Sequence, residues 1–265
     1  MSINNGSNGK VAVILGHPAH VLRIYRFIEI YKPIIYIITD GSGSKGESKL
    51  DHVTRIIEDC GASTSRLTCR FTDAEMYRVI RDAVTETLHG LVEELSEDLG
   101  KNDVAVVAGD AIEGFNPIHD LCRYLINAAV KIHSSRKNRT VGNFDLLLDG
   151  PPDQGSNGDG SIRIKLSAED FARKMQAINA YPGIEPDIQK AMRLYGENAF
   201  QNESLRPVRT PDQLSGWDTD VPFYESYGAK MVESGVYSEV ITFEKHLLPL
   251  AKYLSSLADT NAAHV

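Results

Sequence analysis

Two histidines follow an apolar run near the start of the chain and are candidate metal ligands. His17 and His20 stand three residues apart, directly after the run 11–15. A third histidine, His119, follows a second apolar run, 104–108. Three neutral imidazoles that leave one coordination position open form a recurring catalytic zinc site, in which the metal polarises a carbonyl or lowers the pKa of a bound water. The H-x-x-H spacing is weak evidence by itself, so the fold must bring the three side chains together.

The apolar runs are predicted to be strands of a parallel sheet. Short apolar runs bounded by glycine are typical of strands buried on both faces. Strands alternate with helices through residue 150, which favours an α/β fold: a Rossmann-like open parallel sheet with helices on both faces. The predicted strands are 11–15, 34–39, 67–71, 104–108, 144–148 and 162–166, and the predicted helices are 21–31, 50–60, 73–99, 119–134, 168–181 and 243–257.

The loops that carry the histidines are predicted to face each other. In an open parallel sheet, ligands bind outside the carboxyl ends of the strands, where the strand order reverses. With the common order 3-2-1-4-5, the first and fourth strands are neighbours at that point. The loop after the first strand carries His17 and His20, and the loop after the fourth carries Asp110, Glu113, Asn116 and His119. The three imidazoles are therefore predicted to converge on one crevice.

Composition favours a globular protein and disfavours several other classes. The chain has 265 residues, of which 42% are hydrophobic, enough for a sizeable core. The net charge of −8 disfavours nucleic-acid binding, because a polyanion would be repelled. The three cysteines form no CxxC pair, the N-terminus lacks the apolar stretch of a signal peptide, and no window approaches 18 consecutive apolar residues. We expect a cytoplasmic protein without a membrane span.

The predicted organisation is a flexible tail over residues 1–9 and a single α/β domain over 10–265. Within the domain, 182–265 is expected to form an irregular C-terminal cap or edge. Pro182, Gly183 and Pro186 break the preceding helix, and the pattern beyond Tyr195 is mixed.

Four degenerate motifs occur in order along the first half of the chain. They are Gly16-His17-Pro18-Ala19-His20-Val21, Thr39-Asp40-Gly41, Arg55-Ile56-Ile57-Glu58 and Asn116-Pro117-Ile118-His119. They resemble the AHPDDE, T-D-G, R-x-x-E and H-P-D-H motifs of the PIG-L or LmbE-like zinc-dependent N-acetylglucosaminyl de-N-acetylases. With weaker likenesses at Arg173-Lys174 and Glu197-x-x-Phe200, the resemblance covers roughly residues 10–205.

The resemblance implies that His17, His20 and His119 bind zinc or another divalent transition metal. At the position of His20 the family has an aspartate, so the all-imidazole set carries one less negative charge. The family's general base stands where this chain has Ala19, so either a different residue serves as the base or the protein is not this hydrolase. Asn116 replaces a histidine that assists with the substrate and the oxyanion, and an asparagine amide can also donate to an oxyanion.

The carboxylates in the loop that carries His119 are candidates for a relocated base. Glu113 and Asp110 are chosen because a carboxylate in a partly closed crevice can do general acid–base work. Alternatively, both are solvated loop residues, or Asp110 orients one of the ligand histidines from behind. Asp40 is assigned to the substrate side and is expected to cap or orient rather than to act as the base.

Three side chains in the last third of the chain are also assigned to substrate binding. Arg206 could hold a phosphate or carboxylate as a bidentate donor. Tyr224 and His246 belong to a segment whose rings with polar tips suit the face of a sugar. The alternative interpretation is a surface position for Arg206 and packing within the C-terminal cap for the other two.

The resemblance favours a metal-dependent hydrolase that removes an N-acyl group from an amino sugar or a sugar conjugate. The expected partner is a small-molecule amino sugar or sugar nucleotide, with no nucleic acid, and a homo-oligomer is left open. Two alternatives retain the fold. One is a divergent metal hydrolase with a different substrate in surface-polysaccharide or secondary metabolism, and the other is a non-catalytic sugar-binding relative.

Overall fold

The computed structural model describes residues 9–43, 46–151, 158 and 160–263. The predicted tail, 1–9, lies outside this part of the chain except for Gly9. Within the described residues, none of the helices combines the length and the apolar character needed to cross a bilayer.

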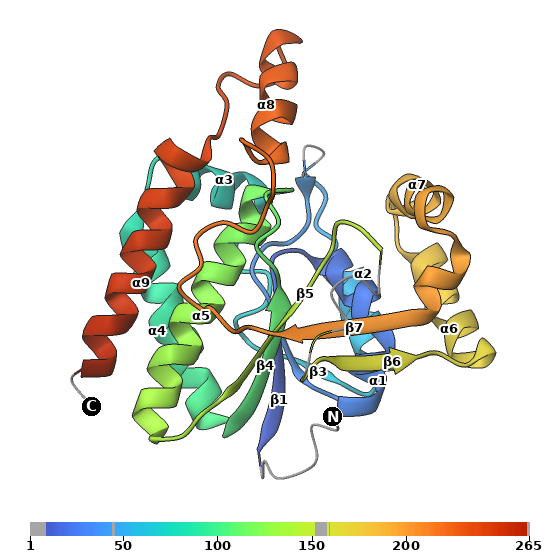
Figure 1. Cartoon of the computed structure of the whole chain (residues 1–265). Coiled ribbons are helices and arrows are strands. Elements are labelled where there is room, and N and C mark those ends of the chain that lie inside the picture. Colours follow the sequence, from blue (N-terminus) through green and yellow to red (C-terminus); the bar gives the residue numbers. More distant parts are fainter. Residues whose placement is uncertain (1–8, 44–45, 152–157, 159, 264–265) are drawn as a thin grey trace.

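A seven-stranded sheet forms the centre of the fold (Figure 1), and its first five strands have the common order that we assumed above. The full order is β3-β2-β1-β4-β5-β7-β6. Strands β1 to β5 pair in parallel, whereas β7 is antiparallel to β5 and β6. The strands are Lys10–Leu15 (β1), Ile34–Ile37 (β2), Ser63–Thr64 (β3), Val104–Asp110 (β4), Gly142–Leu146 (β5), Ile162–Lys165 (β6) and Asn202–Pro207 (β7). The order reverses between β1 and β4, whose carboxyl ends therefore lie side by side.

Both faces of the sheet are covered, which confirms the predicted α/β fold class. Successive residues of a strand point to opposite faces. In β1, Ala12 and Ile14 join one core cluster, and Val11, Val13 and Leu15 join another. The first cluster is completed by helices α3, α4, α5 and α9, and the second by α1, α2 and α6. A strand buried on both faces must be apolar at every position, which explains the continuous apolar runs.

The helices differ in length and lie on both sides of the sheet in Figure 1. They are η1 (Pro18–Ile24), α1 (Tyr25–Tyr31), α2 (Leu50–Asp59), α3 (Asp73–Arg81), α4 (Thr85–Lys101), α5 (Pro117–Lys137), α6 (Ala168–Ala180), α7 (Glu185–Tyr195), η3 (Glu197–Gln201), α8 (Phe223–Glu233), η4 (Phe243–Leu247) and α9 (Leu248–Ala263). Helix α8 stands above the carboxyl edge of the sheet, and α7 lies on the opposite flank from α9.

Two predicted elements in the first half of the chain are wrong. The stretch 67–71 is not a strand; β3 precedes it, and only Phe71 makes a parallel bridge, to Thr39. Cys69 adopts a positive φ of 53°, a conformation that a regular strand excludes. The predicted helix 73–99 is two helices, α3 and α4, separated where Ala83 has a φ of 50°. An amphipathic pattern that continues across such a break looks like one long helix.

Sequence reasoning also missed α7, β7 and α8 in the last third of the chain. Strand β7 has the sequence NESLRP, which contains no apolar run. Its inward positions are Glu203 and Leu205, both almost fully buried. The buried Glu203 pairs with Lys174 of α6, with 2.9 Å between Oε1 and Nζ. Because a charged residue faces the core, the strand lacks the alternation of apolar and polar residues by which a strand is recognised in a sequence.

Candidate metal centre

The loop after β1 sets the positions of His17 and His20. His17 precedes helix η1 with an extended backbone (φ −130°), and Pro18 occupies the first helical position, where its fixed φ suits the turn. The backbone N–H of His20 donates to the carbonyl of His17 at 3.3 Å. This tight turn brings the two imidazole ring centroids to 5.2 Å.

The loop after β4 delivers His119 from the neighbouring strand end. Asn116 is the N-cap of α5, and its Oδ1 accepts a hydrogen bond from the N–H of Ile118 at 2.8 Å. Pro117 follows at the first helical position. His119 is therefore fixed in the first turn of a long, buried helix.

The three histidines meet at the carboxyl edge of β1 and β4, and we call them the histidine cluster. Their ring centroids lie 4.5 to 5.2 Å apart. Each ring offers one nitrogen, and these three atoms all lie within 4.8 Å of one another. His20 and His119 are buried, and His17 is largely so. The rings are thus close enough to share a single metal ion.

Asp110, the last residue of β4, lies directly behind the cluster. Its carboxylate is fully buried and accepts from Nδ1 of His20, with 2.9 and 3.0 Å to its two oxygens. Oδ2 also accepts from the N–H of Gly16 at 2.7 Å. A β-carbon at position 16 would lie only 2.9 Å from that oxygen, so glycine leaves room for the carboxylate. This contact fixes the tautomer of His20 and leaves Nε2 as its metal-binding atom.

A second carboxylate, Asp73, approaches the cluster from the start of α3, and sequence reasoning missed it. Its Oδ1 lies 3.6 Å from Nε2 of His17 and is buried without a hydrogen-bond partner among the described residues. Its Oδ2 accepts from the N–H of Gly43 at 2.7 Å. Asp73 follows Thr72, which forms a capping box with Glu75, so in the sequence it looks like an ordinary acidic residue at a helix start.

Burial keeps the imidazoles of His17 and His119 neutral. It lowers the pKa of His17 to about 4, with a further contribution from the charge of His20. The pKa of His119 is also held well below its usual value, mainly by burial. Nδ1 of His119 is buried and has no partner within the described part of the chain. Neutral rings with available lone pairs are the form that binds a metal ion, so the residues fit a His₃ zinc site.

Three other predicted residues lie around the cluster. Asp40 is buried, and its Oδ1 accepts from the N–H of Ser42 at 3.0 Å. Asn116 caps α5, as described above, and its side chain lies near that of Tyr77. Asp40 is also near enough to His17 to raise the pKa of that ring, against the larger effect of burial.

Glu113 is engaged by the backbone of the loop after β5. Its carboxylate accepts from the N–H of Leu148 at 2.9 and 3.0 Å and from the N–H of Asp149 at 3.0 Å. Burial raises the pKa of Glu113 to about 8, although these hydrogen bonds act in the opposite direction. Both carboxylate oxygens thus have backbone donors.

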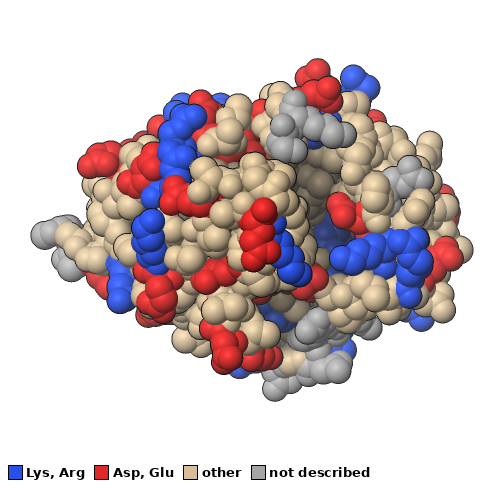
Figure 2. Space-filling view, turned by 90° about the horizontal axis from the view of Figure 1, so that it is seen from above, with Lys and Arg blue, Asp and Glu red and all other residues tan. Residues whose placement is uncertain are grey.

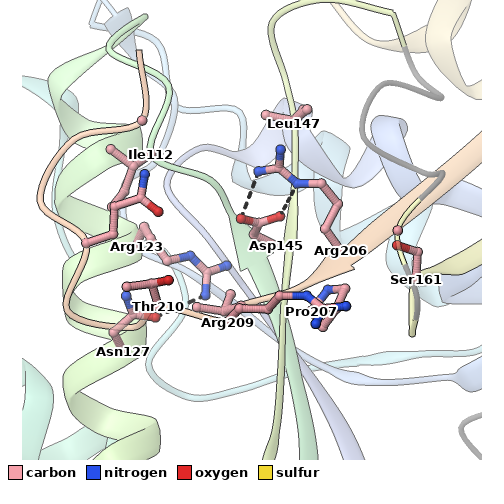
Figure 3. Close-up of a pocket in the computed structure, with 14 residues that line it drawn as sticks. Ile112, Arg123, Asn127, Asp145, Leu147, Ser161, Arg206, Pro207, Arg209 and Thr210 are labelled. Carbon is pink, nitrogen blue, oxygen red and sulfur yellow. Dashed lines mark hydrogen bonds and ion pairs between the residues drawn. The ribbon is translucent and has the colours of Figure 1, made fainter. Parts of the chain in front are cut away.

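The remaining predicted residues are held by partners outside the histidine cluster. Arg206 forms a bidentate pair with Asp145 (2.7 and 2.9 Å) in a cavity of about 330 Å³, which Figure 3 shows and which none of the three histidines lines. Tyr224 is buried, with its ring centroid 6.5 Å from that of Trp217. His246 is buried in η4, directly before the C-terminal helix α9, and its Nδ1 accepts from the N–H of Thr242 at 2.8 Å.

The face above the strand ends is hollowed near its centre (Figure 2). Lysine and arginine side chains are mixed with aspartate and glutamate over this face, rather than gathered into one continuous basic area.

Comparison with known proteins identifies the fold. No family model and no curated protein matches the chain. Among solved structures, the chain is similar to the zinc-inhibited form of the teicoplanin deacetylase Orf2, with 14% identity and a TM-score of 0.53 over 77% of this chain and all of that one. It is also similar to a deacetylase–teicoplanin complex, with 12% identity and a TM-score of 0.53 over 75% and 97% of the two chains. At this identity the likeness shows the fold, which is the one that the sequence motifs led us to expect.

Proposed function

We propose that the protein is a zinc-dependent hydrolase that removes an N-acyl group from an amino sugar or a sugar conjugate. The observation that carries the proposal is the histidine cluster, with the buried carboxylate of Asp110 behind it, at the strand ends where α/β proteins bind ligands. The similar solved structures are described as deacetylases, which supports this reaction class.

In this proposal His17, His20 and His119 hold the metal. When bound, zinc would supply Lewis acidity to the acyl carbonyl and to the attacking water. Asp110 holds His20 in the required tautomer and orientation. The neutral state of the buried rings means that no proton has to leave His17 or His119 near neutral pH.

Oδ1 of Asp73 is a carboxylate oxygen beside the cluster that could replace the base that the resemblance places at the position of Ala19. Asp110 already accepts hydrogen bonds from His20 and Gly16, and Glu113 accepts them from the loop after β5. Oδ1 of Asp73 is buried beside His17 and has no partner among the described residues. We therefore assign Oδ1 of Asp73, rather than Asp110 or Glu113, as the atom that takes the proton of the attacking water.

Asn116 is positioned to stabilise the oxyanion in this proposal. Its Oδ1 is occupied by the N–H of Ile118, which orients the amide, so Nδ2 is the group that can donate. A preorganised donor stabilises developing negative charge without having to reorient during the reaction.

Metal analysis followed by a turnover assay tests the proposal. Protein purified without added metal or an affinity tag should contain close to one zinc per chain, and the His20→Ala variant should lose it. The zinc-loaded protein should then release acetate from N-acetylated amino sugars. Protein that stays metal-free after incubation with zinc would exclude the metal centre. Stoichiometric zinc without release of an acyl group from any N-acyl sugar would exclude the reaction.

A further inference from the structure

A row of partly exposed aromatic side chains leads away from the histidine cluster. The ring centroid of Phe115 lies 6.3 Å from that of His119 and 5.2 Å from that of Phe223, and the planes of the two phenylalanines are nearly parallel, at 6°. Tyr227 continues the row, 6.0 Å from Phe223 at 26°. The three side chains, which we call the aromatic rim, are 39%, 52% and 45% exposed.

The aromatic rim is attached firmly to the loop that carries His119. Gly114, directly before Phe115, has a φ of 67°, and a β-carbon there would lie 2.8 Å from the ring of Trp217, so the turn is closely packed. The carbonyl of Gly114 accepts from the N–H of Tyr224 in the first turn of α8. Glu225 of α8 accepts from the N–H of Phe243 at 2.7 Å. These contacts fix the position of α8, and thus of Phe223 and Tyr227, relative to the metal centre.

Hydroxyl groups lie close to the aromatic rim. Tyr77 of α3 is close enough to Tyr227 and Tyr237 for their hydroxyls to influence one another electrostatically. The side chain of Asn116, in the loop that leads to His119, lies near that of Tyr77. The surface beside the metal centre therefore combines uncharged ring faces with phenolic and amide groups that can donate and accept hydrogen bonds.

We propose that the aromatic rim is a subsite for an uncharged sugar ring joined to the amino sugar whose N-acyl group reaches the metal centre. This inference rests on the proposed function and narrows its substrate to glycosides with at least two rings. A pyranose has an apolar face, which suits an aromatic ring, and a hydroxylated edge, which suits the nearby tyrosines. An acyl chain would leave those hydroxyls unused, and the three side chains of the rim carry no charge to pair with a phosphate.

Equilibrium binding tests the subsite independently of catalysis. N-acetylglucosamine and its β-1,4-linked dimer are titrated calorimetrically into zinc-loaded protein that carries Asp73→Asn, so that turnover does not interfere. We expect the dimer to bind about tenfold more tightly, a typical contribution from one aromatic stacking contact. Phe223→Ala and Tyr227→Ala should each remove most of this advantage and leave the affinity for the monomer unchanged. Both side chains are about half exposed, so their removal should not disturb the core.

Leu194→Ala is the matched control. Leu194 is 63% exposed on α7, far from α8, and its removal should change neither affinity.

Equal affinities for the sugar monomer and the sugar dimer would overturn the subsite. Equal losses of affinity for both sugars in the rim variants would also overturn it. Tighter binding of the phenyl glycoside of N-acetylglucosamine, without tighter binding of the sugar dimer, would also overturn the subsite. The same conclusion would follow if the protein itself formed a concentration-dependent dimer that Phe223→Ala abolishes. If the dimer sugar binds as expected but the wild-type protein releases acetate from neither sugar, the subsite stands and the proposed hydrolysis fails.

Discussion

Asp110 and His20 are separated by 90 positions in the chain, yet the imidazole of His20 donates from Nδ1 to the buried Asp110 carboxylate at 2.9 Å. The two residues come from the ends of adjacent parallel strands, so the sheet itself makes the contact. A histidine that binds a metal through one nitrogen usually donates from the other to such a group, which fixes the ring and increases its basicity.

Replacing Asp110 with Asn should weaken zinc binding by about 10- to 100-fold. The carboxylate faces Nδ1 of His20 with both oxygens, whereas an amide carries no charge and can accept through only one oxygen, so it holds the ring less firmly. The dissociation constant can be measured by competition with a chelator. Asp145→Asn, which alters the ion pair with Arg206 in a different cavity, should leave this constant unchanged. Equal zinc affinity in the wild type and Asp110→Asn would contradict the assigned role.

Asp73→Asn should lower turnover of an N-acyl sugar by about 10²- to 10⁴-fold, the usual contribution of general acid–base catalysis, while zinc remains bound. An amide at this position cannot accept the proton. The measurement combines kcat with zinc content determined on the same sample. Asp82→Asn, at the exposed end of the same helix, is the control and should retain full activity. Unchanged kcat in Asp73→Asn would show that the proton goes elsewhere.

Glu113 should make the folded state less stable as the pH rises. Its pKa is raised by burial from 4.5 to about 8, so between these values the folded protein holds a proton that the unfolded chain has released. Stability is therefore greatest below the lower value and falls as the pH increases towards 8. Glu113→Gln removes this titration and retains an oxygen that can accept from Leu148 and Asp149. Urea denaturation of metal-free protein from pH 5 to 9 should show that the variant becomes more stable relative to the wild type as the pH rises. If the free energies of unfolding of the two proteins changed in parallel with pH, the assignment would be refuted.

Lys174→Met should destabilise the fold by about 3–5 kcal/mol, because it leaves a buried carboxylate without its partner. The side chains of Lys174 and Glu203 are 2% and 0% exposed, and Glu203 also accepts from the backbone N–H groups of Arg26 and Phe27. Lys101→Met removes an exposed ion pair and should change stability by less than about 1 kcal/mol. The free energies of unfolding come from urea titration, and similar values for the two variants would argue against the buried pair.

The core of the fold could be predicted because it depends on short-range patterns. Strands buried on both faces must be apolar at every position, and this requirement makes 11–15 and 104–108 visible in the sequence. Once these strands are neighbours in a parallel sheet, the loops that follow them must lie side by side. The proximity of His17 and His20 to His119 can therefore be predicted without knowledge of side-chain positions.

Other features depend on contacts that no local pattern records. Asp73 has the appearance of a helix-capping residue, and only the packing of α3 brings its free oxygen to His17. Strand β7 contains Glu203, whose burial is tolerated because Lys174, distant in sequence, neutralises it. Arg206 is held by Asp145 of the adjacent strand, a partner that becomes evident only when the strand pairing is known.

The absence of a side chain at Gly16 has a consequence for how this centre can change over evolutionary time. Gly16, His20 and Asp110 form one interlocked set: a methyl group at position 16 would crowd the carboxylate that orients the imidazole. An aspartate introduced at position 20 would meet the existing Asp110 carboxylate, and two adjacent carboxylates cannot both ionise easily. A substitution at any one of these three positions therefore changes the surroundings of the other two, so we expect the three residues to change together.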